Sequence, residues 1–203
     1  TAAIVNGKVY DLHAHLDRFV ISAQNSKLEL PFSKKEMKKI ILETATISNK
    51  RDGSIRYWIS SGTGNLGLIP PEEAKPAFFV MIFGGLDYPK RYYNEGMKVI
   101  TTSYPIKPSL YAVTKSTNYL PNTLMQMEAK EKGFDNGIFV DSNGHVGEGS
   151  NMNTAFVSRD KKLKHPKFDN IPACMITLFV FMGLHKGLIG ARHSVELFKR
   201  FVL

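Results

Sequence analysis

The sequence predicts an α+β fold in two domains, on three observations. Apolar residues recur at helical spacing in some segments, whereas others are the short β-branched and aromatic runs typical of strands. The predicted strands do not alternate regularly with helices, which argues against a chain of βαβ units. Residues 84–94 combine glycine, proline and several charges, and are the best linker candidate. We therefore expect a small N-terminal α/β domain at 1–88 and a β-rich domain at 89–203.

The first domain opens with the strongest hairpin signal in the sequence. Asn6-Gly7 lies between two short apolar runs, 2–5 and 8–12. This dipeptide favours the tight turn that joins two antiparallel strands. A helix is predicted over 15–28, because its apolar residues recur three and four positions apart.

A capping box predicts the start of a second helix. Ser33 is followed three residues later by Glu36, and in this arrangement each side chain satisfies a backbone N–H of the other residue. Strands over 54–60 and 77–83 complete the first domain. The residues of the second helix that are expected to face inward are Met37, Ile40, Ile41 and Thr44.

The second domain is predicted to contain one amphipathic helix and several strands. The helix covers 120–132, has Pro121 in its first turn, and is expected to turn Leu120, Leu124 and Met127 inward. The strands expected before and after this helix are 97–103, 137–141, 145–147, 154–158 and 163–165.

Composition excludes several functional classes. The chain has 203 residues, 43% of them hydrophobic, which is enough to bury a substantial core. Its single cysteine, Cys174, allows no internal disulfide and suits a reducing compartment. The net charge of +9 is spread along the chain without a nucleic-acid-binding motif. It would suit small anions such as phosphate esters and carboxylates, but a surface that is merely basic is the commoner case. The apolar segment 171–184 is too short to span a bilayer and is predicted to be a buried helix or strand.

A histidine pair and a glycine-rich stretch suggest metal or dinucleotide binding, but the residues around them do not support either function. His13 and His15 have the spacing of a metal-binding pair, but no cluster of Cys, Asp or Glu completes the site, so no metal is expected. The glycine-rich stretch 62–67 is similar to a dinucleotide-binding loop. It leads into Pro70-Pro71 instead of a helix, so dinucleotide binding is not expected either.

Two segments carry the candidate chemistry. Lys115 precedes the helix at 120–132 in a loop with little other charge. Burial and neighbouring cations can turn a lysine in such a place into a nucleophilic amine, although a solvated loop lysine is the commoner case. About thirty residues later, a short strand runs into Glu148, and the turn of small residues that follows ends at Asn153.

Together these two segments resemble the class IV, D-amino-acid-transaminase-like family of pyridoxal-phosphate (PLP) enzymes. The plant-type D-amino-acid transaminase and aminodeoxychorismate lyase branch is the most similar. The resemblance runs from Thr1 to about Asn170, and it implies a fold-type IV enzyme whose second domain is part of a β-rich pseudo-barrel. The supporting stretches are His15-Leu16-Asp17-Arg18, Leu30-Pro31-Phe32, Ser54-Ile55-Arg56-Tyr57-Trp58, Asn118-Tyr119-Leu120-Pro121-Asn122 and Asn151-Met152-Asn153.

The resemblance also implies the cofactor, PLP, and a set of site residues. Lys115 aligns with the Schiff-base lysine, which also carries a proton between substrate and cofactor. Glu148 aligns with the acid that pairs with the pyridine nitrogen. The remaining aligned residues are Arg18 for the phosphate, Tyr119 near the ring hydroxyl, Asn153 near the cofactor and Arg56 facing the substrate carboxylate.

The implied reaction moves an amino group between an amino acid and a 2-oxo acid, with a D-amino acid as the first choice. Aminodeoxychorismate lyase, in which Lys115 would drive elimination of pyruvate, is the alternative, and branched-chain transamination comes third. Both ends of the family pattern are missing, so we also consider a truncated, non-catalytic relative. The resemblance further implies a homodimer and a soluble protein of the plastid or cytoplasm.

The last expectation concerns the segment after Asn170. The resembled branch continues there with a glycine- and threonine-containing turn that holds the cofactor phosphate at a helix N-terminus. This chain instead has Pro172, which lacks an N–H, and its nearest hydroxyl is Thr177. We therefore expect a recognisable site geometry at Lys115, Glu148 and Arg18 but weak cofactor binding and weak turnover.

Overall fold

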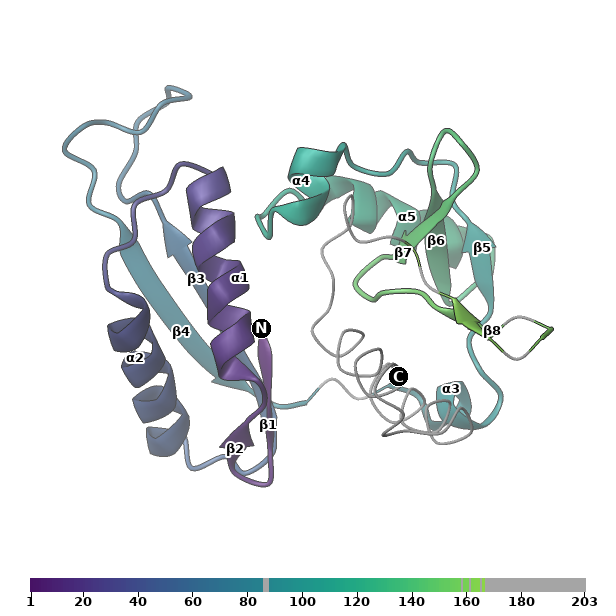
Figure 1. Ribbon diagram of the computed structural model, residues 1–203, viewed down its shortest axis with the longest axis horizontal. Helices are drawn as coiled ribbons and strands as arrows, with labels where there is room; N and C mark the ends of the chain where they lie inside the picture. Colours follow the sequence, from purple (N-terminus) through teal and green to yellow (C-terminus); the bar gives the residue numbers. More distant parts are fainter. Residues whose placement is uncertain (86–87, 158, 161, 165, 167–203) are drawn as a thin grey trace. The chain divides into compact units, whose positions relative to one another are not determined.

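The computed structural model describes residues 1–85, 88–157, 159–160, 162–164 and 166 (Figure 1). The chain divides into two compact units between Asp87 and Tyr88. Both units mix helices with sheets, so the predicted α+β class is confirmed. The domain assignment at 1–88 and 89–203 remains a proposal.

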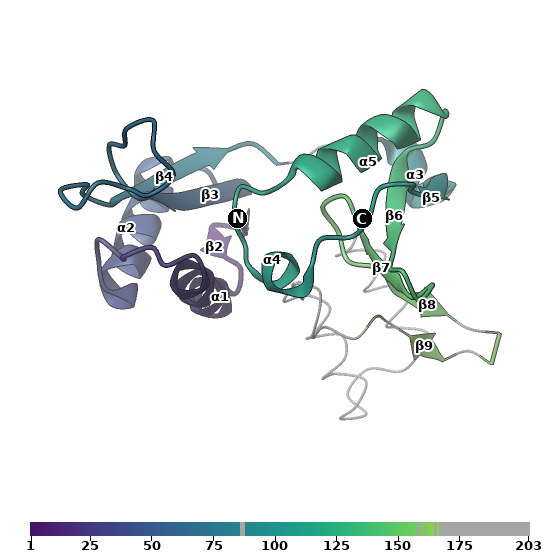
Figure 2. The ribbon, with the colours of Figure 1, turned by 90° about the horizontal axis from the view of Figure 1, so that it is seen from above.

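The first unit is a four-stranded antiparallel sheet with two helices on one face (Figures 1 and 2). Its strand order is β2-β1-β3-β4. The strands are β1 Ala2–Val5, β2 Lys8–Val9, β3 Gly53–Ser60 and β4 Ala77–Phe83. The helices, α1 Leu12–Asn25 and α2 Lys34–Ile47, occupy the connection between β2 and β3.

The predicted hairpin at Asn6-Gly7 is confirmed, but the predicted bounds of the first helix were wrong. Asn6 and Gly7 have positive φ angles of 51° and 76° and join β1 to β2, as a tight hairpin requires. Helix α1 begins three residues earlier than predicted. It also ends three residues earlier, because Lys27 turns left-handed (φ 53°) and the N–H of Leu28 returns to the carbonyl of Ala23 at 2.9 Å.

The core of the first unit lies between the helices and the sheet. Along β3, Ile55 and Tyr57 face the helices and are buried, while Arg56 and Trp58 alternate to the opposite face and are exposed. In α2 the capping box is present, and Met37 and Ile41 are fully buried, whereas Ile40 and Thr44 are half-buried. The core residues are Ile4, Leu12, Leu16, Met37, Ile41, Ile55 and Tyr57.

The second unit contains a three-stranded sheet of order β5-β6-β7, parallel between β5 and β6 and antiparallel between β6 and β7. These strands are β5 Val99–Thr101, β6 Asn136–Val140 and β7 Val146–Gly149. Helices α4 Ser109–Val113 and α5 Leu120–Glu131 connect β5 to β6. A separate hairpin is formed by β8 Phe156–Val157 and β9 Leu163–Lys164.

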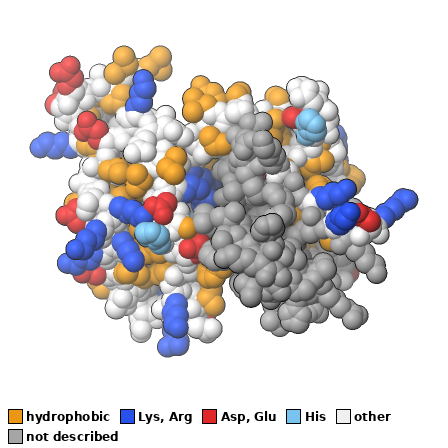
Figure 3. Space-filling view, in the orientation of Figure 1, with side chains coloured by type: hydrophobic (Ala, Val, Ile, Leu, Met, Phe, Trp, Pro, Cys, Tyr) orange, Lys and Arg blue, Asp and Glu red, His pale blue; other side chains and the backbone are white. Residues whose placement is uncertain are grey.

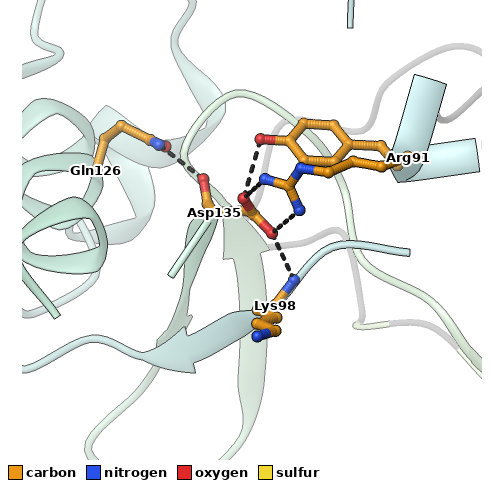
Figure 4. A network of polar contacts seen from close by, with 5 residues as sticks. Arg91, Lys98, Gln126 and Asp135 are labelled. Atoms are coloured by element: carbon orange, nitrogen blue, oxygen red, sulfur yellow. Dashed lines mark hydrogen bonds and ion pairs between the residues drawn. The ribbon is translucent and has the colours of Figure 1, made fainter. Parts of the chain in front are cut away.

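The predicted linker at 84–94 is partly wrong, because its second half is helix α3, Lys90–Asn94. This short helix is tied to the rest of its unit by Asp135 (Figure 4). The Arg91 guanidinium donates to both carboxylate oxygens, Tyr92 Oη donates at 3.1 Å and the Lys98 N–H at 2.8 Å. The hydrogen bonds from Arg91 and Lys98 hold the pKa of Asp135 down at about 2.

The inward face predicted for α5 is also wrong. Leu120 and Met127 are 66% and 52% exposed, and the buried side chains belong instead to Asn122, Met125, Glu128 and Ala129. Met125 lies directly on β6, where a Cβ added to Gly137 would come within 2.3 Å of Met125 Cγ. The close approach of helix and strand therefore requires glycine at 137.

On the face of the first unit visible in Figure 3, basic and acidic side chains are interspersed. Within the described part of the chain, no helix is both long enough and apolar enough to cross a membrane. The apolar segment 171–184 lies outside the described residues.

Candidate active site

Lys115 lies in the short connection between α4 and α5, and its side chain reaches the next helix. The side chain is exposed, and its Nζ atom lies 4.4 Å from the ring centre of the half-buried Tyr119, the N-cap residue of α5. The backbone of Tyr119 is held on both sides, since its N–H donates to Thr117 O and its carbonyl accepts from Thr123 N. The structure therefore places the predicted amine against the predicted ring-hydroxyl partner.

Glu148 lies in β7, where its side chain is only 8% exposed. Among the described residues, no group donates a hydrogen bond to its carboxylate. Burial raises the pKa of Glu148 to about 6, while the positive charges of Lys107 and Lys115 act in the opposite direction. A buried carboxylate that accepts no hydrogen bond from the described residues, within the electrostatic influence of two cations, suits an N–H donor from a ligand.

The turn after Glu148 is fixed by helix α5. Gly149 N–H donates to the Met152 carbonyl at 2.8 Å and closes the turn. Asn122 Nδ2 donates to the Ser150 carbonyl at 2.7 Å, and Ser150 Oγ donates to Gln126 Oε1 at 2.9 Å. Asn122 and Gln126 are four residues apart and so share one side of the helix. The helix that follows Lys115 thus also positions the residues that follow Glu148.

Asn153 ends the turn with an unsatisfied donor. Its Nδ2 atom is buried and has no hydrogen-bond partner among the described residues. The neighbouring Thr154 is held by a hydrogen bond from its Oγ1 to the Gly147 carbonyl. Since an unpaired buried amide costs stability, a free Asn153 N–H at this place suits a ligand acceptor.

Arg18 belongs to the first unit, on α1, and sequence reasoning did not identify its partner. Its Nη2 atom lies 3.2 Å from Nδ1 of His15, one helical turn earlier. Burial, then the charges of Arg18 and of the N-terminus, lower the pKa of His15 to about 4. Burial also raises the pKa of Tyr57 to about 12, with Arg18 opposing it. The signal in the sequence was the three-residue spacing of His15 and Arg18, which places both on one helix face.

Arg56 does not join Arg18. It lies on β3 between two core residues, and its exposed side chain therefore points to the face of the sheet that the helices leave open. There its guanidinium carbon lies 5.5 Å from the ring centre of Phe83. The structure thus forms one group around Lys115, Tyr119 and Glu148, and another around His15 and Arg18. The functional role of each residue remains a prediction.

The side chains of the second unit fit PLP in kind. PLP needs an amine for its aldehyde, a carboxylate for its ring nitrogen and polar groups for its hydroxyl and phosphate. Lys115, Glu148 and Tyr119 supply these types on adjacent elements, and Asn153 has a buried donor that no described residue pairs. We call Lys115, Tyr119 and Glu148 the lysine cluster.

Comparisons with known proteins agree with this geometry. The family model described as "Amino-transferase class IV" matches residues 1–179. The chain is 45% identical over 172 residues to "D-amino-acid transaminase, chloroplastic" of Arabidopsis thaliana, covering 84% of this chain and 45% of that protein. It is 34% identical over 163 residues to "Putative branched-chain-amino-acid aminotransferase" of Methanocaldococcus jannaschii, covering 79% of this chain and 55% of that protein.

The fold is also that of solved class IV enzymes. The branched-chain aminotransferase of the archaeon Thermoproteus uzoniensis, solved with norvaline, superimposes with a TM-score of 0.80 at 24% identity. The match covers 91% of this chain and 64% of that one, which confirms the predicted fold-type IV architecture. The chain spans about half the length of the curated relatives it matches. By its family match and its identity to these relatives, the chain belongs to the class IV aminotransferases.

Proposed function

We propose that this chain carries the central part of the active site of a PLP-dependent aminotransferase. The reaction would move an amino group between an amino acid and a 2-oxo acid. The observation that carries this proposal is the lysine cluster, in which Lys115 contacts Tyr119 and acts electrostatically on a buried Glu148 that lacks a hydrogen-bond donor in the described part of the chain. A D-amino acid is our first choice of substrate, because the relative named a D-amino-acid transaminase is 45% identical.

Each residue of the cluster has a separate task in this proposal. Bound PLP would supply an electron sink for the substrate carbon. Lys115 would provide the amine that attaches the cofactor, and would carry the proton from the substrate carbon to the C4′ atom of the cofactor. Glu148 would accept the N–H of the cofactor ring, which requires its ionised form. Tyr119 would donate its hydroxyl to the ring oxygen.

The remaining residues would bind the ends of the ligands. Arg18 would hold the phosphate, since a guanidinium contacts a dianion with two parallel hydrogen bonds. Asn153 would offer to the cofactor its Nδ2 group, which has no acceptor among the described residues. Arg56 would attract the substrate carboxylate. We further propose a homodimer, and, from the name of the relative in A. thaliana, a plastid location.

Absorbance of the purified chain with added PLP tests the proposal. We expect the visible band of cofactor attached to lysine, and we expect Lys115→Ala to abolish it. Lys130→Ala is the matched control, since Lys130 is an exposed lysine on the following helix. No band in the wild-type chain, or an equal band in the Lys115→Ala variant, would contradict the proposal.

A substrate comparison tests the finer assignment. With 2-oxoglutarate as acceptor, D-alanine should be consumed faster than L-isoleucine, which represents the branched-chain amino acids named for the M. jannaschii relative. The lyase alternative would instead release pyruvate from aminodeoxychorismate without any 2-oxo acid. Faster consumption of L-isoleucine would favour the branched-chain assignment. Pyruvate release from aminodeoxychorismate, with no transamination of either amino acid, would favour the lyase.

A further inference from the structure

We propose that Lys107 is a positioning residue of the lysine cluster, a second lysine whose charge steadies the Glu148 carboxylate and the Tyr119 ring while Lys115 is engaged in chemistry. This inference rests on the function proposed above. It concerns a residue that the sequence motifs do not include.

The backbone holds Lys107 in place. It lies between Pro105 and Pro108, and Pro108 caps helix α4. Proline fixes its own φ angle and keeps the preceding residue extended, so this segment has few conformations available. Lys107 itself is half-buried, unlike the exposed Lys115. Its position is therefore determined by the fold more strictly than that of an ordinary loop lysine.

Packing places this segment against the strand that carries Glu148. A Cβ added to Gly147 would lie 2.6 Å from Ile106 Cδ1, so the two residues are in close contact. Ile106 precedes Lys107, and Gly147 precedes Glu148. The segment that carries Lys107 is therefore packed on β7, and Lys107 is the stronger of the two cations that favour the ionised form of Glu148.

The Tyr119 ring connects the two lysines. Nζ of Lys107 lies 5.1 Å and Nζ of Lys115 lies 4.4 Å from the centre of this ring. Both distances are within the range of a cation–π interaction. Tyr119 would therefore keep one cation contact when the other lysine changes its charge or its bonding.

Chemistry gives the two lysines different tasks. An amine attacks a carbonyl only in its unprotonated form, so Lys115 cannot act as nucleophile or base and also remain a full cation beside Glu148. In the described residues, Lys107 is the other cation that acts on Glu148. A buried carboxylate without a countercharge would take up a proton and could no longer accept the N–H of a ring nitrogen. Lys107 supplies that countercharge independently of Lys115.

The test is the pKa of Glu148, measured by carboxyl ¹³C NMR on the 203-residue chain without cofactor. In Lys107→Met we expect this pKa to rise by about one, because an opposite charge nearby is lost. Lys107→Arg keeps the charge and should leave the pKa as in the wild type, and so should the control Lys130→Met. An unchanged pKa in Lys107→Met, or an equal rise in Lys130→Met, would overturn the proposal.

Folding and function are separated by design. Circular dichroism would test whether each variant is folded. Lys107→Gln would repeat the pKa measurement with a neutral side chain that can form hydrogen bonds. If both neutral variants unfold, Lys107→Arg still tests the proposal. A pKa of Glu148 in that variant that differs from the wild-type value would overturn it. The measurement needs no PLP. If the wild-type chain shows no cofactor band, the proposed function is wrong, but the measured pKa of Glu148 still tests the role of Lys107. If the pKa of Glu148 does not depend on Lys107, the role of Lys107 is wrong, but the cofactor band still tests the proposed function.

Discussion

Nδ1 of His15 accepts a hydrogen bond from the guanidinium of Arg18 at 3.2 Å. A guanidinium only donates, so the imidazole must be neutral at this nitrogen, in agreement with its pKa of about 4. His15 would therefore orient the predicted phosphate-binding arginine throughout the neutral pH range.

His15→Ala should weaken PLP binding about tenfold, since a hydrogen bond to a charged group contributes about 1.5 kcal/mol. Fluorescence titration with PLP at pH 7 measures the affinity. His13→Ala is the control, because His13 is an exposed histidine on the same helix, with its Nε2 atom 3.6 Å from Asp17 Oδ2. Equal affinities of the His15→Ala variant and the wild type would show that Arg18 needs no orientation by His15.

Glu148 gives the chain a specific pH dependence. Because burial raises the pKa of Glu148 to about 6, the folded chain binds this proton more tightly than the unfolded chain does. The stabilisation of the folded chain by protonated Glu148 is complete below pH 4.5 and is lost as the pH rises through about 6. The loss amounts to about 2 kcal/mol of unfolding free energy.

Glu148→Gln removes this dependence. The measurement is urea unfolding at pH 4.5 and at pH 7. Between these pH values the free energy of unfolding should fall by about 2 kcal/mol less in the variant than in the wild type. The same substitution should also weaken PLP binding, because the neutral amide cannot neutralise a protonated ring nitrogen. Identical pH profiles of the two proteins would show that Glu148 has an ordinary pKa in the folded chain.

Local chemistry explains which parts of the fold could be predicted from the sequence. The Asn6-Gly7 turn and the Ser33 capping box depend on residues within a few positions, and both are present. Helix α3 was missed because its anchor, Asp135, lies 44 residues away from Arg91. The C-terminal end of α1 was missed because the left-handed residue that follows it is a lysine, Lys27, where glycine is the usual signal.

The same reasoning applies to the candidate site. Lys115 and Glu148 belong to sequence motifs, so their positions were predicted, but Lys107 acts on Glu148 from 41 positions earlier in the chain and carries no local signal. On α5 the apolar pattern pointed to Leu120, whereas the buried side chain is Asn122, which is needed to hold Ser150. A polar side chain with a distant partner is invisible to hydrophobic periodicity.

Asn122→Ala should loosen the turn after Glu148. The substitution removes the hydrogen bond to the Ser150 carbonyl and leaves that group without its partner, which costs about 1–3 kcal/mol of unfolding free energy. Urea unfolding measures the cost, and the affinity for PLP should fall in parallel. Thr123→Ala is the control, as Thr123 is the exposed neighbour on the same helix. A cost equal to that of Thr123→Ala would mean that α5 does not hold the turn.

Gly137→Ala tests the contact between α5 and β6. The new methyl group would lie 2.3 Å from Cγ and 2.8 Å from Sδ of Met125, so the methionine must leave its place. We expect a loss of about 1–3 kcal/mol of unfolding free energy, the usual cost of overpacking a core. Gly84→Ala is the control, because Gly84 has no atom within 4 Å of an added Cβ.

A double-mutant cycle identifies the cause of that loss. Met125→Ala alone should destabilise the chain by about 2–5 kcal/mol, since it empties a fully buried site. In the Met125→Ala background the added methyl group has room, so Gly137→Ala should then cost little or restore stability. If Gly137→Ala costs the same in both backgrounds, the strain arises from the backbone of β6 and not from its contact with the helix.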